Sequence, residues 1–229
     1  MSQEPIHKRT VRSFVRREGR LTLGQERALT DYWPRYGIEA SDGLLDFQQI
    51  FGRIAPVHLE IGFGKGECLL AQAVQHPEIN FVGVEVFRPG AGHLIHQLQE
   101  HNCNNAKVVL TDAVEFLQKQ VPDKSLDRVC IFFADPWHKK KHHKRRLIQA
   151  SFIHLLTQKL KFGGELYLAT DWQHYADHMR EVLLQEKRLE NIYPKNDFAP
   201  RANFRPLTKF EKRGQGLGHE VWDLAFRRK

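Results

Sequence analysis

The chain of 229 residues is 41% hydrophobic, which is enough to build one α/β domain with a substantial core. No stretch approaches the roughly 18 uninterrupted apolar residues of a membrane span, and the three cysteines (Cys68, Cys103 and Cys130) are scattered without metal-ligand spacing. We therefore expect a cytoplasmic protein with no membrane association and no metal site, and its net charge of +8 is a weak pointer to a polyanionic partner.

Most of the positive charge is concentrated in two short segments. Residues 1–20 carry six basic and two acidic side chains, and residues 138–146 carry six basic side chains and no acidic one. A phosphate-binding surface requires such a concentration, although either run taken alone is equally compatible with a solvated surface. The arginine-rich start is also similar to a mitochondrial transit peptide, but Glu4 and Glu18 favour a basic arm on a cytoplasmic protein.

The order of elements predicts an α/β fold. Residues 1–56 are expected to form a basic N-terminal extension, partly flexible, with little core of its own. From residue 57 to residue 229, short β-branched runs alternate with amphipathic stretches, which is typical of a parallel sheet with helical crossovers. Residues 221–226 alternate with period two, so we predict a doubly wound, mostly parallel sheet with an antiparallel C-terminal edge strand.

The remaining elements follow from the same patterns. Strand 129–133 is apolar throughout and is therefore expected at the centre of the sheet. The other parallel strands are expected at 57–61, 81–85, 107–110 and 165–169, and the helices include 113–120, 147–160 with an end at the glycines of 162–164, and 173–187.

Four of the predicted strand ends carry a carboxylate. Glu60, Glu85, Asp112 and Asp135 follow one another at intervals of about one βα unit. Ligands of doubly wound sheets bind at the carboxyl ends of the strands. We therefore expect these four acids to surround one ligand.

A glycine-rich turn directly follows the first strand. Gly62, Gly64 and Gly66 have the spacing G-x-G-x-G, whereas a dinucleotide site prefers G-x-G-x-x-G. A carboxylate beside this turn would repel a pyrophosphate, but it suits the ammonium and sulfonium groups of S-adenosylmethionine. We predict this cofactor, with Glu85 accepting hydrogen bonds from both ribose hydroxyls and Asp112 facing the adenine amine.

The substrate side is expected beyond the fourth strand, at Asp135-Pro136-Trp137. A carboxylate followed by proline and an aromatic residue is typical of methyltransferases that act on ring or amine nitrogens. Trp137 either stacks on a purine or anchors the core. Asp171 and Trp172 end the next strand. Residues 205–214 mix charges with aromatic residues; they form either a loop that binds phosphate and base together or an ordinary surface turn. His138, His142 and His143 lack partners at metal-ligand spacing.

These motifs together resemble the bacterial tRNA (guanine-N7)-methyltransferase family over nearly the whole chain. The departures from the family pattern are Lys65, Phe87-Arg88 and Ala134, and none of them replaces a matched functional residue. The resemblance is carried by Arg12-Ser13-Phe14-Val15-Arg16-Arg17, Trp33-Pro34-Arg35-Tyr36-Gly37, Leu59-Glu60-Ile61-Gly62-Phe63-Gly64, Asp135-Pro136-Trp137-His138-Lys139, Ala169-Thr170-Asp171-Trp172, Thr208-Lys209-Phe210-Glu211 and Gly218-His219-Glu220-Val221-Trp222-Asp223-Leu224.

The resemblance implies a class I, Rossmann-like S-adenosylmethionine-dependent enzyme. It would methylate N7 of a guanine in tRNA, at position 46 of the variable loop. Both a monomer and a homodimer are compatible with the sequence. By motif, the cofactor-binding residues are Glu60, Gly62, Gly64, Glu85, Asp112 and Asp135, and the substrate-binding residues are Lys139, Asp171, Thr208, Lys209, Phe210 and Glu211.

The chemistry that we expect is alignment rather than base catalysis. Guanine N7 has an in-plane lone pair and no proton at neutral pH, so Asp135, supported by Asp171, is expected to hold the base and stabilise the positive charge that develops on it. Residues 138–146 and 7–20 are expected to bind RNA phosphates. The alternatives are a methyltransferase for another RNA base or a small molecule, a non-catalytic RNA-binding module and a NAD-dependent oxidoreductase.

Overall fold

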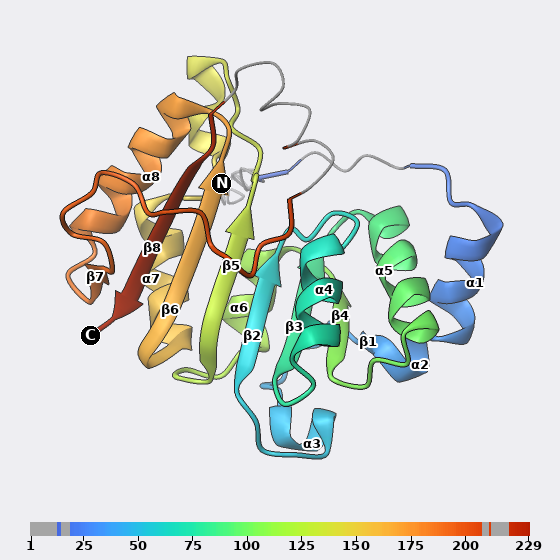
Figure 1. Ribbon diagram of the computed structural model, residues 1–229. Helices are drawn as coiled ribbons and strands as arrows, with labels where there is room; N and C mark the ends of the chain where they lie inside the picture. The colour runs from blue at the N-terminus through green and yellow to red at the C-terminus, as the bar shows by residue number, and fades with distance from the viewer. Residues whose placement is uncertain (1–12, 15–18, 208–210, 212–219) are drawn as a thin grey trace, which may run out of the picture.

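The computed structural model describes residues 13–14, 19–207, 211 and 220–229. Its centre is an eight-stranded sheet with the order β1-β4-β3-β2-β5-β6-β8-β7 (Figure 1). The strands are β1 (Gly37–Ile38), β2 (Val57–Ile61), β3 (Asn80–Glu85), β4 (Ala106–Leu110), β5 (Leu126–Phe132), β6 (Leu160–Thr170), β7 (Leu189–Asn191) and β8 (Trp222–Arg228).

Helices cover both faces of this sheet, so the predicted doubly wound fold is confirmed. In Figure 1, α4 and α5 lie in front of the strands, and α6 and α7 lie behind them. The helices are α1 (Leu23–Asp31), α2 (Trp33–Tyr36), α3 (Phe47–Phe51), α4 (Glu67–Gln75), α5 (Arg88–Glu100), α6 (Ala113–Lys119), α7 (Ala150–Lys159) and α8 (Gln173–Gln185), with a 3-10 helix η1 (Lys140–Arg145) before α7.

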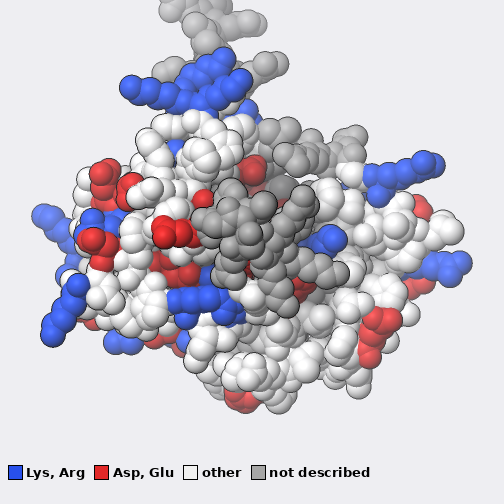
Figure 2. All heavy atoms as spheres, turned by 45° about the horizontal axis from the view of Figure 1, so that its top comes forward, with Lys and Arg blue, Asp and Glu red and all other residues white. Residues whose placement is uncertain are grey.

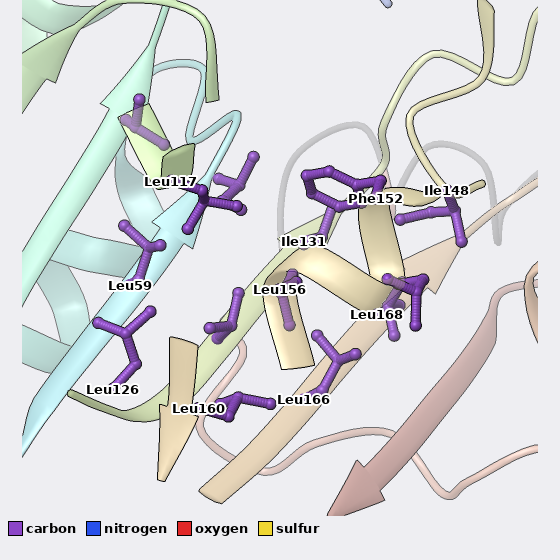
Figure 3. Close-up of a cluster of buried hydrophobic side chains, with 14 of the residues drawn as sticks. Leu59, Leu117, Leu126, Ile131, Ile148, Phe152, Leu156, Leu160, Leu166 and Leu168 are labelled. Atoms are coloured by element: carbon purple, nitrogen blue, oxygen red, sulfur yellow. The ribbon is translucent and has the colours of Figure 1, made fainter. Parts of the chain in front are cut away.

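Each face has its own hydrophobic core. The larger core packs β2, β5 and β6 against α6, α7 and α8, and Figure 3 shows its centre around Leu59, Ile131 and Leu156. The smaller core lies between β3, β4 and the helices α1, α4 and α5. β5 pairs in parallel with both β2 and β6, which confirms the central position that its apolar sequence predicts.

Residues 19–56 add to this sheet and to both cores. α1 begins with a capping box, in which Thr22 and Gln25 exchange side-chain and backbone hydrogen bonds, and it packs on α5. β1 pairs in parallel with β4 at one sheet edge. Tyr36 is buried, and its hydroxyl donates to the carbonyl of Leu98 (3.3 Å). The division of the chain at residue 57 stays a prediction.

The structure corrects the predicted helix over 147–160. α7 begins only at Ala150, and Leu160 already has an extended backbone and pairs with Leu126 in the sheet. Gly163 (φ 76°) therefore does not end a helix; it lies within β6, where the register to β5 shifts. Leu160 is held in the strand by its pairing with Leu126, and its side chain is buried in the larger core.

The predicted antiparallel C-terminal strand is confirmed as β8, which pairs with β6. Its predicted place at the edge of the sheet is wrong, because the short β7, which no sequence pattern predicted, pairs with the other side of β8 and forms the edge. No helix in the described part of the chain has both the length and the apolar character that a bilayer crossing requires.

A close approach of α5 to the glycine-rich turn provides a test of this architecture. A Cβ added at Gly90 would collide with the carbonyl oxygen of Gly64, whereas a Cβ at Gly43 would meet no heavy atom within 4 Å. Gly90→Ala should therefore destabilise the fold by about 1–3 kcal/mol. In thermal melts we expect a loss of at least about 2 °C for Gly90→Ala and no loss for Gly43→Ala. Equal melting temperatures for the two variants would contradict this packing.

Candidate active site

A cavity of about 420 Å³ opens at the carboxyl ends of β2, β3, β4 and β5. Its size and position are those of a small-molecule site in a doubly wound sheet. Five of the six predicted cofactor-binding residues line it, namely Gly62, Gly64, Glu85, Asp112 and Asp135. Glu60, Lys139 and Asp171 are not among the described residues that line the cavity.

The glycine-rich turn presents bare backbone to this cavity. Gly62 and Gly64 have φ values of 72° and 58°, a region that favours glycine. A Cβ added at either position would meet no heavy atom within 4 Å, so both positions face open space. A side chain at either site would occupy room that is left for a ligand, and the turn therefore fits a bound cofactor.

Glu85 fixes the turn to the end of β3. Its Oε2 accepts a hydrogen bond from the backbone N–H of Gly64 (2.9 Å), and its Oε1 accepts from Val86 (2.7 Å) and Phe87 (3.1 Å). Three of about four acceptor positions of the carboxylate are thus used by the chain itself. This geometry leaves one acceptor position for a ligand, whereas two ribose hydroxyls were expected to bind there.

Asp112 has a structural task of its own. Its Oδ1 accepts hydrogen bonds from Val114 (2.8 Å) and Glu115 (3.1 Å) and so caps the N-terminus of α6. Its Oδ2 has no hydrogen bond from the described residues. Because Asp112 also lines the cavity, this second oxygen is the one available to a ligand.

Glu60 is buried on the first strand of the site. Its Oε2 has no hydrogen-bond partner among the described residues. Burial raises the pKa of Glu60 to about 8, and the charge of Glu85 adds to this, while a hydrogen bond with Cys68 lowers it. Glu60 is therefore mainly protonated at neutral pH, and it lies next to the cavity lining as an uncharged acid.

The turn after β5 is strained on both sides of Asp135. Phe133 (φ 55°) and Trp137 (φ 47°) are non-glycine residues in the left-handed region. Each such residue costs about 1–3 kcal/mol and persists only where its surroundings hold it. The backbone N–H of Phe133 donates to Ala169 of β6 (2.8 Å), and the exposed Asp135 is presented at the cavity.

Trp137 is held by contacts within the chain. Its indole N–H donates to the carbonyl of Ser13 (3.1 Å), and the guanidinium of Arg145 lies 3.9 Å from its ring centre. Ser13 and Phe14 also line the cavity. Ser13 and Phe14 therefore meet the side of the cavity that carries Asp135 and Trp137, a contact that no sequence pattern indicated.

The basic run 138–146 is divided by the structure. The side chains of Lys139, Lys140, Lys141 and Lys144 are exposed, whereas Arg145 is half-buried on Trp137 and Arg146 is only 2% exposed. Figure 2, which views the carboxyl ends of the strands, shows Lys and Arg side chains projecting from several places on the periphery of this face.

The other predicted substrate residues have different settings. Asp171 is exposed at the end of β6, the strand next to β5. Glu211 is buried and accepts hydrogen bonds from Arg205 (2.8 Å) and Arg201 (3.3 Å). Arg205, which was not singled out from the sequence, also binds Asp223 of β8 (2.8 Å). Thr208, Lys209 and Phe210 lie outside the described residues.

The histidines near the site do not form a metal centre. Within the described ranges there is no group of three or more His, Cys, Asp or Glu side chains that could hold a metal ion. His138 packs edge-on against Trp172 (4.2 Å between ring centres), and His143 lies against His174 (5.0 Å).

Comparison with known proteins gives close relatives. A family model described as a putative methyltransferase matches residues 54–224. The tRNA (guanine-N(7)-)-methyltransferase of Yersinia enterocolitica is 53% identical over 221 residues, which are 96% of this chain and 92% of that protein. The enzyme of the same name from Ectopseudomonas mendocina is 50% identical over 228 residues, which are 100% of this chain and 96% of that protein.

Solved structures confirm the fold at low sequence identity. The 16S rRNA methyltransferase KamB superposes with a TM-score of 0.57 at 13% identity, covering 81% of this chain and 95% of that one. The aminoglycoside resistance methyltransferase NpmB1 superposes with a TM-score of 0.52 at 15% identity, covering 92% of this chain and 95% of that one. The chain therefore has the class I methyltransferase fold.

The buried Glu60 predicts a pH-dependent stability. A glutamate exposed to water, as in the unfolded chain, has a pKa of 4.5, whereas the pKa of Glu60 in the fold is about 8. The native state therefore keeps a proton that the unfolded chain releases. The stability from this neutral acid is present below about pH 4.5 and is lost as the pH rises through 8. Since glutamine does not ionise, Glu60→Gln should have a higher melting temperature than the parent protein at pH 8.5. This difference in melting temperature should become smaller towards pH 5.

Melting curves at several pH values check this expectation. The exposed Glu190 provides the control: the melting temperature of Glu190→Gln should differ from that of the parent by the same amount at every pH. If the melting temperatures of Glu60→Gln and the parent differ by the same amount at pH 5 and at pH 8.5, then Glu60 is ionised in the fold.

Proposed function

The chain belongs to the tRNA (guanine-N7)-methyltransferase family, and on this premise we propose that its cavity binds S-adenosylmethionine and that Asp135 meets a guanine of tRNA. One observation carries the proposal: a glycine-rich turn and the acids Glu85, Asp112 and Asp135 line one cavity at the carboxyl ends of four neighbouring strands. The protein is proposed to act in the cytoplasm, where tRNA is the polyanionic partner that its basic segments fit.

The chemistry of the lining supports this cofactor. S-adenosylmethionine supplies an electrophilic methyl group on a positively charged sulfur. The bare backbone at Gly62 and Gly64 allows close approach, and the carboxylates favour a cation over a pyrophosphate. The remaining acceptor position of Glu85 suits a ribose hydroxyl, and Oδ2 of Asp112 suits the adenine amine.

Asp135 is proposed to hold the guanine. N7 carries a lone pair and no proton, so the chain needs no general base and its main task is to align the base. The strained turn presents the Asp135 carboxylate at the cavity, where it accepts hydrogen bonds from the base edge. As the methyl group transfers, positive charge develops on the purine, and the fixed carboxylate stabilises it. Asp171 supports this role from the end of the neighbouring strand.

The exposed lysines are proposed to hold the RNA backbone. Lys139, Lys140, Lys141 and Lys144 project from or beside η1, next to the Asp135 turn. Phosphate contacts of this kind position a nucleic acid and do not read its sequence. The choice of guanine is therefore assigned to Asp135 and its surroundings, and the Thr208–Glu211 segment is proposed to take part in substrate binding.

Replacement of Glu85 tests the cofactor site. Glutamine has one acceptor oxygen and would direct its N–H₂ group at backbone N–H donors, so Glu85→Gln should loosen the turn at Gly64. We expect binding of S-adenosylmethionine, measured by isothermal titration calorimetry, to weaken by about tenfold or more. The exposed Glu115 is the control, and Glu115→Gln should bind as the parent does. Unchanged affinity in Glu85→Gln would place the cofactor elsewhere.

Replacement of Asp135 tests the reaction. Asp135→Asn keeps the shape but removes the negative charge, so turnover on tRNA should fall by about 10²–10³. The dissociation constant for tRNA should stay within about threefold, because phosphate contacts are retained. The assay methylates total tRNA and maps 7-methylguanosine by borohydride–aniline cleavage. The exposed Asp177 is the control, and Asp177→Asn should be fully active. Near-normal turnover of Asp135→Asn would refute the assigned role.

A further inference from the structure

Arg146 differs from the rest of the basic run to which it belongs. It is 2% exposed, whereas Lys140, Lys141 and Lys144 in the same run are exposed. Burial lowers the pKa of Arg146, and no carboxylate in the described part of the chain lies within ion-pair distance of it. A buried cation without an ionic partner is costly and needs hydrogen bonds to hold it.

The guanidinium has three partners around it. Its Nε donates to the carbonyl oxygen of Pro136 (2.9 Å), and its Nη2 contacts Nδ1 of His174 (3.2 Å). Because arginine only donates, Nδ1 of His174 is the acceptor in this contact. The guanidinium also lies 4.9 Å from the ring centre of Tyr175, which is fully buried.

The contact with Pro136 lies at a critical place. Pro136 follows Asp135 directly and stands between the two left-handed residues Phe133 and Trp137. Proline has no N–H, so its carbonyl is the backbone group through which this part of the turn is held. The strain of the turn must be offset by contacts that permit one conformation only. Arg146, which lies between η1 and α7, supplies such a contact. Through its second hydrogen bond, to His174, it also links the turn to α8.

We propose that Arg146 is a positioning residue for the reaction, which fixes the Asp135–Pro136 turn through the Pro136 carbonyl and makes no contact with RNA phosphate. This inference rests on the role proposed above for Asp135. It separates Arg146 from its exposed neighbours, which are assigned to phosphate binding.

The experiment compares Arg146→Lys and Arg146→Gln with Lys144→Gln. Lysine keeps the buried charge but lacks the planar fork, and each Arg146 replacement leaves at most one of the two hydrogen bonds. Displacement of the Asp135 turn should lower kcat by about 10- to 100-fold. Binding of S-adenosylmethionine should stay within about twofold, and the slope of log tRNA affinity against log salt should not change. A thermal melt and the cofactor titration verify that Arg146→Lys is folded.

Lys144→Gln should differ from the Arg146 variants in its salt dependence. Its slope of log tRNA affinity against log salt should fall by up to about one unit, because an exposed phosphate contact is lost. The inference is overturned if an Arg146 variant lowers the salt slope as Lys144→Gln does, or if Arg146→Lys keeps the parent kcat. Near-normal kcat of Arg146→Lys beside an inactive Asp135→Asn would refute this inference alone, whereas an active Asp135→Asn refutes the proposed function first.

Discussion

The carboxylate of Glu85 accepts hydrogen bonds from the backbone on both sides of the cavity, from Gly64 after β2 and from Val86 and Phe87 after β3. Each of these N–H groups lies beyond the last pairing of its strand, where the sheet no longer supplies a partner. The Glu85 side chain thus takes the place of the backbone hydrogen bonds between β2 and β3 at the point where these two strands separate. The cavity exists because the strands stop pairing there and the glycine turn is still held in place.

The Asp135 turn is held by a different physical arrangement. Its two left-handed residues are stabilised by cations that pack on them or on their neighbours: Arg145 on the ring of Trp137, Arg146 on the carbonyl of Pro136, and Arg205 at 5.3 Å from the ring centre of Phe133. Arg205 is itself bound to Glu211 and to Asp223 of β8, so the turn is tied to both of these acids. A planar guanidinium suits this task, since it stacks on rings and donates in its plane.

The sequence predicted the sheet and the cavity because both depend on local patterns. The apolar strands, their spacing and the acids at their ends are each readable within about one βα unit. The failures concern residues whose role depends on distant partners. Leu160 belongs to a strand because it pairs with Leu126, and the buried guanidinium of Arg146 is satisfied by the carbonyl of Pro136 and by His174 of α8. In the sequence, nothing separates Arg146 from the other basic residues of the run 138–146. Likewise, nothing near Arg205 indicates that it binds Asp223, eighteen positions away.

The division of the basic run also changes what its charge can do. Of the six Lys and Arg side chains in residues 138–146, Arg145 and Arg146 are engaged with Trp137, Phe14, Pro136 and His174, which leaves four exposed lysines. Only exposed cations release counterions when they meet a phosphate, so the count of basic residues overstates the salt dependence of RNA binding. The two arginines instead act inward, on the acidic turn that faces the cavity. The same short segment therefore has two surroundings: four lysines are exposed to solvent, where we propose that they meet a polyanion, and two arginines contact the turn that carries Asp135.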